Sequence, residues 1–178
     1  MKQLGTGADD NTGNQRGAGF WGFSVALYGR PGVAEACLAL QDRFGADVNM
    51  LLLGFWRARR GFAGWAAGEL DRAQAAVAPV NAALLPLRQA RRALKDLQAD
   101  EPAAAALYDE AKQLELRLEQ IAQVWLAAAS RFSPAMQDTA DEEMAAAAHL
   151  YAYLDGLAPR DEAARELGAA LLRAAFTA

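Results

Sequence analysis

One short run restricts what this chain can fold into more than any other feature. In residues 50–56, Met-Leu-Leu-Leu-Gly-Phe-Trp, no side chain is charged or carries an amide or hydroxyl group. A helix made from this run is apolar on every side, which is the pattern of a helix at the centre of a protein. The run is also far shorter than the roughly 20 residues that span a membrane. The sequence therefore predicts a buried central helix near residues 48–58, surrounded by the rest of the chain.

The segment in front of this run predicts an amphipathic helix with clear ends. Its apolar residues recur at spacings of four, three and four, which is typical of one buried helical face, and they are Val33, Cys37, Leu40 and Phe44. Pro31 fits the first turn of that helix, because the N–H that it lacks has no partner there. Gly45 is expected to end the helix, and Asp47 to cap the next one.

The remainder of the chain predicts further helices and no sheet, since no stretch shows sustained alternation with β-branched residues. An apolar segment at residues 20–28 starts the fold. Pro79 and Pro86 interrupt a periodic segment at residues 69–97, which predicts two helices or one kinked helix. Two more helices are expected, near residues 138–154 and 159–176. We predict an all-α fold, an irregular bundle of about six or seven helices.

A long amphipathic helix is predicted near residues 103–131, packed beside the central one. Its apolar residues alternate at spacings of four and three. The face expected to be buried consists of Leu107, Ala111, Leu114, Leu118, Ile121 and Trp125. Ser133 and Pro134 are expected to break this helix.

Composition predicts a single soluble domain behind a disordered tail. Residues 1–18 contain almost no large apolar side chain, so we expect disorder there and one helical domain over residues 19–178. The only cysteine is Cys37. Because no apolar leader follows a charged start either, we expect a protein of the reducing cytoplasm without a membrane span.

A longer pattern in the first half of the chain carries a family resemblance. It combines an aromatic run, Phe-Trp-Gly-Phe-Ser-Val-Ala-Leu-Tyr, with the ends of the next helix, the central run and a basic segment. These are residues 20–28, 31–34, 37–42, 45–49, 52–56, 86–88 and 91–95. The pattern resembles an uncharacterised proteobacterial family of small all-helical proteins, a domain of unknown function, over roughly residues 20–97. The resemblance implies a bacterial cytosolic all-α protein and no particular reaction, so no catalytic residue is carried over.

The sequence contains no set of residues typical of a catalytic or metal site. A zinc site needs several Cys or His ligands, and the chain has one of each, Cys37 and His149. A Glu-x-x-His pair of the di-iron type is missing, because Ala146 stands three residues before His149. Cys37 lies on a predicted apolar face, and the only histidine, which could activate it as a base, is more than a hundred residues away in the sequence. We expect no cofactor and no metal, and the residues favour a protein that is not an enzyme.

Polar side chains gather around the turn that precedes the central helix. Gln41, Asp42, Asp47 and Asn49 bracket this turn, and with Trp56 as an apolar wall they could form a ligand pocket, which needs only a few convergent polar groups. The same side chains are able to satisfy the backbone groups at the two helix ends instead. Both interpretations stay open from the sequence.

Charge divides the chain into a basic and an acidic half. The net charge is +4 over residues 19–98 and −8 over residues 99–178, within −4 for the whole chain. Seven cations of the basic half form a predicted binding surface: Arg57, Arg59, Arg60, Arg88, Arg91, Arg92 and Lys95. The last four fall on one side of a helix, and we call them the basic stripe.

Three explanations of the basic stripe are open. Acids of the other half can pair with it inside the protein, with Asp109, Glu115 and Glu119 as candidates and Arg91 as the cation most readily engaged. An acidic protein partner or a second copy of the chain can cover it. A phosphorylated ligand or a nucleic-acid backbone is the third explanation, but the negative net charge and the lack of interleaved aromatic residues disfavour nucleic acid.

Two functions follow as hypotheses. The first is a non-enzymatic interaction or regulatory module of the bacterial cytoplasm, whose basic helical surface binds an acidic protein partner. The alternative is a small-molecule-binding protein or enzyme with a polar pocket at the turn of residues 41–49.

Overall fold

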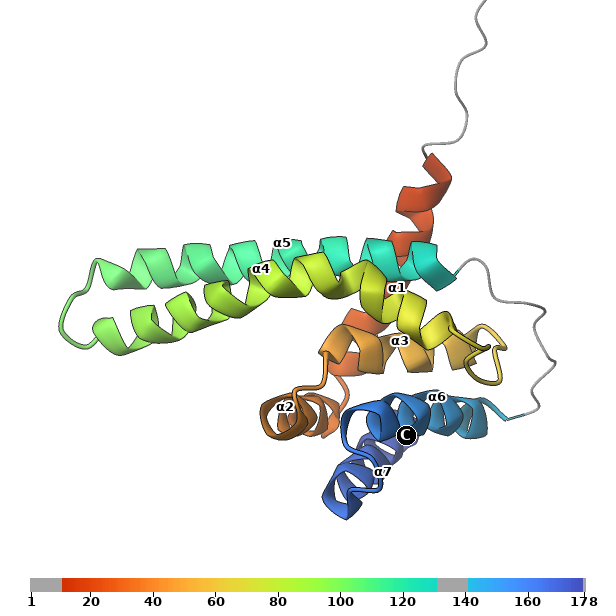
Figure 1. Ribbon diagram of the computed structural model, residues 1–178. Coiled ribbons are helices and arrows are strands. Elements are labelled where there is room, and N and C mark those ends of the chain that lie inside the picture. Colours follow the sequence, from red (N-terminus) through yellow and green to blue (C-terminus); the bar gives the residue numbers. More distant parts are fainter. Residues whose placement is uncertain (1–10, 131–140, 178) are drawn as a thin grey trace, which may run out of the picture.

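Seven helices and no strand make up the part of the chain that the computed structural model describes, residues 11–130 and 141–177. The helices are α1 (Asn11–Tyr28), α2 (Val33–Phe44), α3 (Val48–Arg59), α4 (Glu69–Leu97), α5 (Ala104–Ala129), α6 (Glu142–Leu157) and α7 (Glu162–Phe176) (Figure 1). The predicted all-α fold is confirmed. No helix in these ranges has the length and apolarity that crossing a membrane requires.

The predicted tail and the predicted break after the long helix fall partly outside the described residues. Residues 1–10 of the tail lie outside, and the backbone of residues 11–18 belongs to α1. Residues 131–140, which contain Ser133 and Pro134, lie outside as well.

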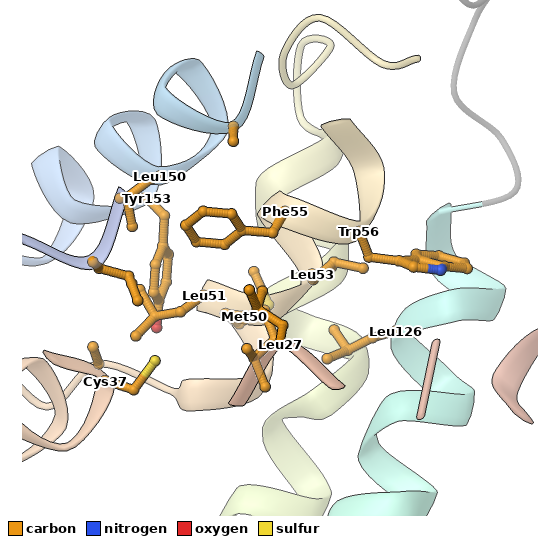
Figure 2. Close-up of a cluster of buried hydrophobic side chains, with 14 of the residues drawn as sticks. Leu27, Cys37, Met50, Leu51, Leu53, Phe55, Trp56, Leu126, Leu150 and Tyr153 are labelled. Atoms are coloured by element: carbon orange, nitrogen blue, oxygen red, sulfur yellow. The ribbon is translucent and has the colours of Figure 1, made fainter. Parts of the chain in front are cut away.

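α3 lies at the centre of the molecule, as predicted, and buries every residue from Asn49 to Ala58. α6 packs along one side of it, and α1 and α5 contact it from elsewhere (Figure 1). In the core, Phe55 extends toward Leu150 and Tyr153 of α6, whereas Trp56 points in another direction (Figure 2). α7 packs on α6 and α2, and these three helices together with α3 supply most residues of the apolar core.

The close approach of α3 and α6 explains the glycine within the apolar run. A Cβ atom at Gly54 would lie 3.1 Å from the Cβ of His149. Real Cβ atoms rarely come so near a neighbour, so one of the two helices would have to shift. Gly54 therefore lets two helix backbones approach each other where a larger residue would separate them.

The helix ends around α3 lie where the sequence predicts them. Gly45 ends α2 in the left-handed conformation, with φ 70°, and its N–H donates to the carbonyl of Gln41. Asp47 caps α3, because its Oδ1 accepts the N–H of Asn49 at 2.8 Å. Aspartates also cap the last two helices, Asp141 at α6 and Asp161 at α7.

α4 and α5 form a long antiparallel hairpin that projects from the rest of the molecule, and we call it the arm (Figure 1). α4 is one helix rather than two, although it contains Pro79 and Pro86. Both prolines are exposed and lie seven residues apart, on the same face of the helix. Each proline removes one backbone hydrogen bond, and on the solvent side this loss is tolerated because the freed carbonyl can bind water.

The buried face of α5 differs from the predicted one, and this part of the prediction is wrong. Of the six predicted residues, only Ala111 is buried and Leu118 is half-buried; Leu107, Leu114, Ile121 and Trp125 are exposed. The buried residues are Ala104, Ala111, Glu115, Ala122, Gln123, Leu126 and Ala127. Small alanines allow α4 to lie close, and Glu115 is paired with arginines of α4. Helix packing and charge pairing, rather than the size of the side chains, therefore determine which face of α5 is buried.

Candidate functional site

Arg57, the first cation of the predicted binding surface, lies inside the protein with 1% of its surface exposed. Its Nη1 and Nη2 donate to the two carboxylate oxygens of Glu69 at 2.9 and 2.8 Å. The guanidinium also lies 4.4 Å from the ring centre of Trp65 and 4.9 Å from that of Phe62. Arg57 therefore ties the loop between α3 and α4 to the core and is not part of a surface.

His149 holds the same loop from the side of α6. Its Nε2–H donates to the carbonyl of Phe62 at 3.0 Å, and its own carbonyl accepts the indole N–H of Trp65 at 3.0 Å. Burial, with a smaller effect of the Arg57 charge, lowers the pKa of His149 to about 4. The ring is therefore neutral at physiological pH, and its role is to anchor the loop.

Arg59 and Arg60 remain at the surface at the end of α3, and each contacts a neighbouring side chain. Arg59 Nη1 lies 3.1 Å from Glu142 Oε2, in a pair that is exposed on both sides. The guanidinium of Arg60 lies 4.6 Å from the ring centre of Trp56. Exposed contacts of this kind contribute only about 0–1 kcal/mol each, so neither fixes the fold.

The first two cations of the basic stripe pair with acids of α5. Arg88 Nη2 lies 2.8 Å from Glu119 Oε1, and Arg91 Nε lies 2.5 Å from Glu115 Oε1. Both arginines are 24% exposed, and Glu115 is 11% exposed, so the pairs are partly shielded from water. The hydrogen bond to Glu115 raises the pKa of Arg91 above its ordinary value. Two of the three acids proposed from the sequence thus lie opposite the stripe, and Asp109 is not among the partners found.

The last two cations of the stripe are more exposed. Arg92 Nη2 lies 3.9 Å from Asp42 Oδ1, with both side chains about two-thirds exposed. For Lys95 the described residues provide no carboxylate within 4.0 Å. Three of the four stripe cations therefore have an acid of the same chain within ion-pair distance, and the imbalance that suggested an external partner is largely removed.

The polar turn divides into two parts. Asp47 is occupied by structure: besides capping α3, its Oδ2 accepts from Asn81 Nδ2 at 2.7 Å, and its backbone N–H donates to the hydroxyl of Tyr153 at 2.8 Å. Asp42 is exposed, and Trp56 stacks at 4.9 Å on the ring of Phe20. None of these three predicted pocket residues lines either of the two cavities described below.

The remaining two, Gln41 and Asn49, line one cavity together with two cations of the basic stripe, Arg88 and Arg91. The cavity has a volume of about 420 Å³ and lies between α1, α2, α3, α4 and α5, where the arm meets the core. We call it the junction cavity. Its volume falls within the roughly 300–1,000 Å³ of small-molecule sites. The turn and the stripe, which the sequence presents as separate features, therefore meet at one place.

Most of the junction cavity is apolar. Its walls come from aromatic and aliphatic side chains of α1, α2, α3 and α5: Trp21, Val25, Tyr28, Leu38, Leu52 and Leu116. Val25, Leu38 and Leu116 are between 41% and 55% exposed, although each is a large apolar side chain. An apolar ligand that covered them would remove this surface from water, which is favourable.

Two residues that line the cavity each carry a buried polar atom with no hydrogen-bond partner among the described residues. These atoms are the hydroxyl oxygen of Ser24 and Oε1 of Gln123, and each residue is 2% exposed. The other end of the Gln123 amide is held, because Nε2 donates to Oδ1 of Asn49 at 2.9 Å. A buried acceptor without a hydrogen bond destabilises the folded protein by about 1–3 kcal/mol. A ligand that donates a hydrogen bond to it recovers part of this free energy on binding.

Sequence reasoning missed both of these residues. A signal existed for Ser24, since Phe20, Ser24 and Leu27 follow one another at spacings of four and three, which places a hydroxyl on an apolar face. Gln123 could not be found in this way, because the buried face of α5 was assigned to other residues. A polar residue within a buried helical row is the pattern to look for in such chains.

A second cavity, of about 270 Å³, lies near the C-terminal end of α7. Phe23, Phe55 and Phe176 line it, together with Arg30 and Arg59. Its charged groups are engaged, as Arg30 donates to the carbonyl of Ala175 and Arg59 pairs with an acid. Because no unpartnered buried polar atom faces it among the described residues, it lacks the feature that distinguishes the junction cavity.

Neither the cysteine nor the acidic residues that the structure describes are arranged as a thiolate or metal site. Burial raises the pKa of the Cys37 thiol to about 12, so it is not a thiolate at physiological pH. Within residues 11–130 and 141–177, no group of three or more His, Cys, Asp or Glu side chains is placed to hold a metal ion.

These features define the class of protein: an all-helical protein with a central buried helix, a projecting helical hairpin and one largely apolar cavity between them. Residues 19–126 match the model of a family described as protein of unknown function (DUF2390), and the chain belongs to this family. The matched segment contains every residue that lines the junction cavity. No curated protein and no solved structure matches the chain.

Proposed function

We propose that the protein binds a small, uncharged and largely apolar molecule in the junction cavity. The observation that carries this proposal is a pair of buried polar atoms, Ser24 Oγ and Gln123 Oε1, which belong to residues that line an apolar cavity and have no hydrogen-bond partner among the described residues. An amide oxygen accepts hydrogen bonds, so the ligand should present an N–H or O–H donor. We propose that the binding is non-enzymatic, because the two carboxylates that line the cavity, Glu115 and Glu119, are held in ion pairs with arginines.

The charges at the cavity support an uncharged ligand. Two arginines and two glutamates line it, Arg88 and Arg91 against Glu115 and Glu119, and they are paired with one another. A charged ligand would have to break one of these pairs and leave a partly buried charge behind, which is costly. A neutral ligand leaves them intact.

An acidic protein partner for the basic stripe receives less support. This hypothesis rests on positive charge that has no counter-charge within the chain. Three of the four stripe cations, however, have a carboxylate of the same chain within 4.0 Å. We also propose that the protein works in the bacterial cytoplasm, since its single cysteine is a buried thiol and needs no oxidising compartment.

Thermal-shift measurements with matched probes test the proposal. The probes are neutral indoles, anilides and alcohols, each paired with its N- or O-methylated twin, which lacks the donor. A molecule that binds the native state raises the melting temperature. We expect several donors to raise it and their methylated twins to raise it less. If no probe raises it, the proposal is wrong.

Two variants connect the signal to the cavity. Ser24→Ala and Gln123→Met should reduce the difference between a donor and its methylated twin. Ser130→Ala is the matched control, because Ser130 also has a buried hydroxyl for which the described residues provide no partner, but it does not line the cavity. A donor preference that survives in both cavity variants, or that disappears equally in the control, would overturn the assignment.

A further inference from the structure

The outer side of α5 carries a row of exposed apolar residues that the fold leaves uncovered. Leu107, Leu114 and Ile121 are 52%, 48% and 43% exposed, and they recur every seven residues. Seven residues are almost two helical turns, so the three side chains form one row along the helix. Trp125, 42% exposed, extends the row by one more turn. We call these four residues the outer row.

The outer row is separate from the surfaces that α5 uses within the chain. α4 covers the side of Ala104, Ala111 and Glu115, which is roughly 60–100° around the helix from Leu114 at the centre of the row. A heptad row of large apolar side chains is the pattern by which two helices associate. In this chain the row lies on the projecting arm, where a second molecule has access (Figure 1).

Two charges beside the outer row are arranged symmetrically about its centre. Glu110 and Arg117 are both exposed, lie on the same edge of the row, and stand four residues before and three residues after Leu114. Neither has an ion-pair partner within 4.0 Å among the described residues. If a second α5 packs antiparallel with Leu114 on the two-fold axis, Glu110 of one copy lies opposite Arg117 of the other, twice over.

We propose that the outer row is a self-association surface, at which two copies of the chain pair through antiparallel α5 helices. The apolar residues match under the same symmetry, since Leu107 faces Ile121 of the other copy and Leu114 faces itself. A parallel arrangement brings the two charged edges to opposite sides and loses both ion pairs. The charge pattern therefore favours a second copy in the antiparallel orientation.

The size of the surface predicts a weak dimer. From Leu107 to Trp125 the helix rises about 27 Å. A single helical row of this length is small against the roughly 800 Å² that each partner buries in a standard interface. We expect a reversible equilibrium between monomer and dimer, with a dissociation constant in the micromolar range.

Sedimentation equilibrium over a wide range of protein concentration tests this inference. The wild type should show a reversible dimer, and Leu114→Lys should abolish it. Arg117→Glu and Glu110→Arg should each weaken the dimer at least about tenfold, because like charges then face each other. The double variant Glu110→Arg/Arg117→Glu should restore it. Lys112→Glu is the control, since it makes the same charge change on another side of α5. Far-UV circular dichroism verifies that each variant is folded.

Cysteine crosslinking tests the orientation. Leu114→Cys should form a disulfide dimer under mild oxidation, because the residue faces itself. Leu107→Cys should not do so alone but should crosslink to Ile121→Cys in a mixture. The native Cys37 is buried and does not compete. A chain that is monomeric at every concentration, a dimer that Arg117→Glu and Lys112→Glu weaken equally, or a Leu107→Cys self-crosslink would overturn the inference.

Discussion

The core around α3 and the arm formed by α4 and α5 are held together by different means. α3 buries ten consecutive residues, most of them large and apolar. In α4 no residue beyond Leu84 is fully buried, and the buried positions in the first half of α5 are two alanines and Glu115. The core depends on apolar burial on all sides, whereas the outer part of the arm depends on small residues and ion pairs.

Both regions contain Arg–Glu pairs, and the comparison shows how burial changes their role. Arg57 and Glu69 are fully buried and bring the base of the arm to the core, so the loss of either partner leaves a charge in an apolar site. The side chain of Arg91 is 24% exposed and that of Glu115 is 11% exposed, so water can reach a charge whose partner has been removed. The same chemical pair is therefore essential in one region and modest in the other.

Removal of the buried guanidinium should have the largest effect. Arg57→Leu removes the guanidinium that neutralises the buried Glu69 carboxylate and should lower the free energy of unfolding by about 3–5 kcal/mol. Urea denaturation measures it. Arg165→Leu, which removes one partner of an exposed pair with Asp155, is the matched control and should cost less than about 1 kcal/mol. Equal effects of the two variants would contradict the distinction drawn here.

Truncation of a leucine to alanine should destabilise the protein much more in the core than in the arm. Leu53 in α3 is 0% exposed and Leu85 in α4 is 62% exposed. Leu53→Ala should lower the free energy of unfolding by about 2–5 kcal/mol, through lost burial and the cavity left behind. Leu85→Ala should change it by no more than about 0.5 kcal/mol. The two midpoints of urea denaturation give the comparison directly.

Acid should weaken the core through His149. Its pKa is about 4 in the folded protein and about 6.5 when unfolded, so the unfolded state binds more protons between these values. Stability is therefore lost as the pH falls from about 6.5 toward 4, and the loss reaches roughly 2.5 kcal/mol at about pH 4.5. Arg57 favours the neutral ring and Glu69 opposes it. His149→Asn should show a shallower pH dependence over this range, and an identical profile would exclude His149 as the cause.

The smallest effect is expected in the arm. Glu115→Gln removes the charge that pairs with Arg91 and should lower the free energy of unfolding by only about 1 kcal/mol, because both partners retain contact with water. Its effect should be local: amide hydrogen exchange in residues 85–110 should speed up, while exchange in α3 stays unchanged. Equal acceleration in α3 would show that the arm and the core do not open separately.

The sequence predicts the core well because local signals agree there. The apolar run, the glycine at the end of α2 and the cap at Asp47 each indicate the same helix and the same boundaries. The arm is predicted less well, because its signals conflict. Leu107, Leu114 and Ile121 suggest a buried row by size, but the helix buries alanines and Glu115 instead, since these allow α4 to pack closely.

The candidate site could be predicted only in part. Gln41 and Asn49 were indicated by a cluster of polar residues around a turn, and both line the junction cavity. Asp47, from the same cluster, is occupied by helix capping and by bonds to α4 and α6. Which acceptors remain unpaired depends on contacts between five helices, and no spacing along the chain contains that information.

The position of α6 against α3 has a consequence for how this chain can be divided. The family segment ends at residue 126, before α6 begins. One flank of the central helix is covered only by residues that come later, among them Leu150 and Tyr153 (Figure 2). During synthesis this flank of α3 stays exposed to solvent until α6 and α7 have been made. A fragment that ends at residue 126 would therefore expose one flank of the apolar core, because α6 and α7 are needed to cover it.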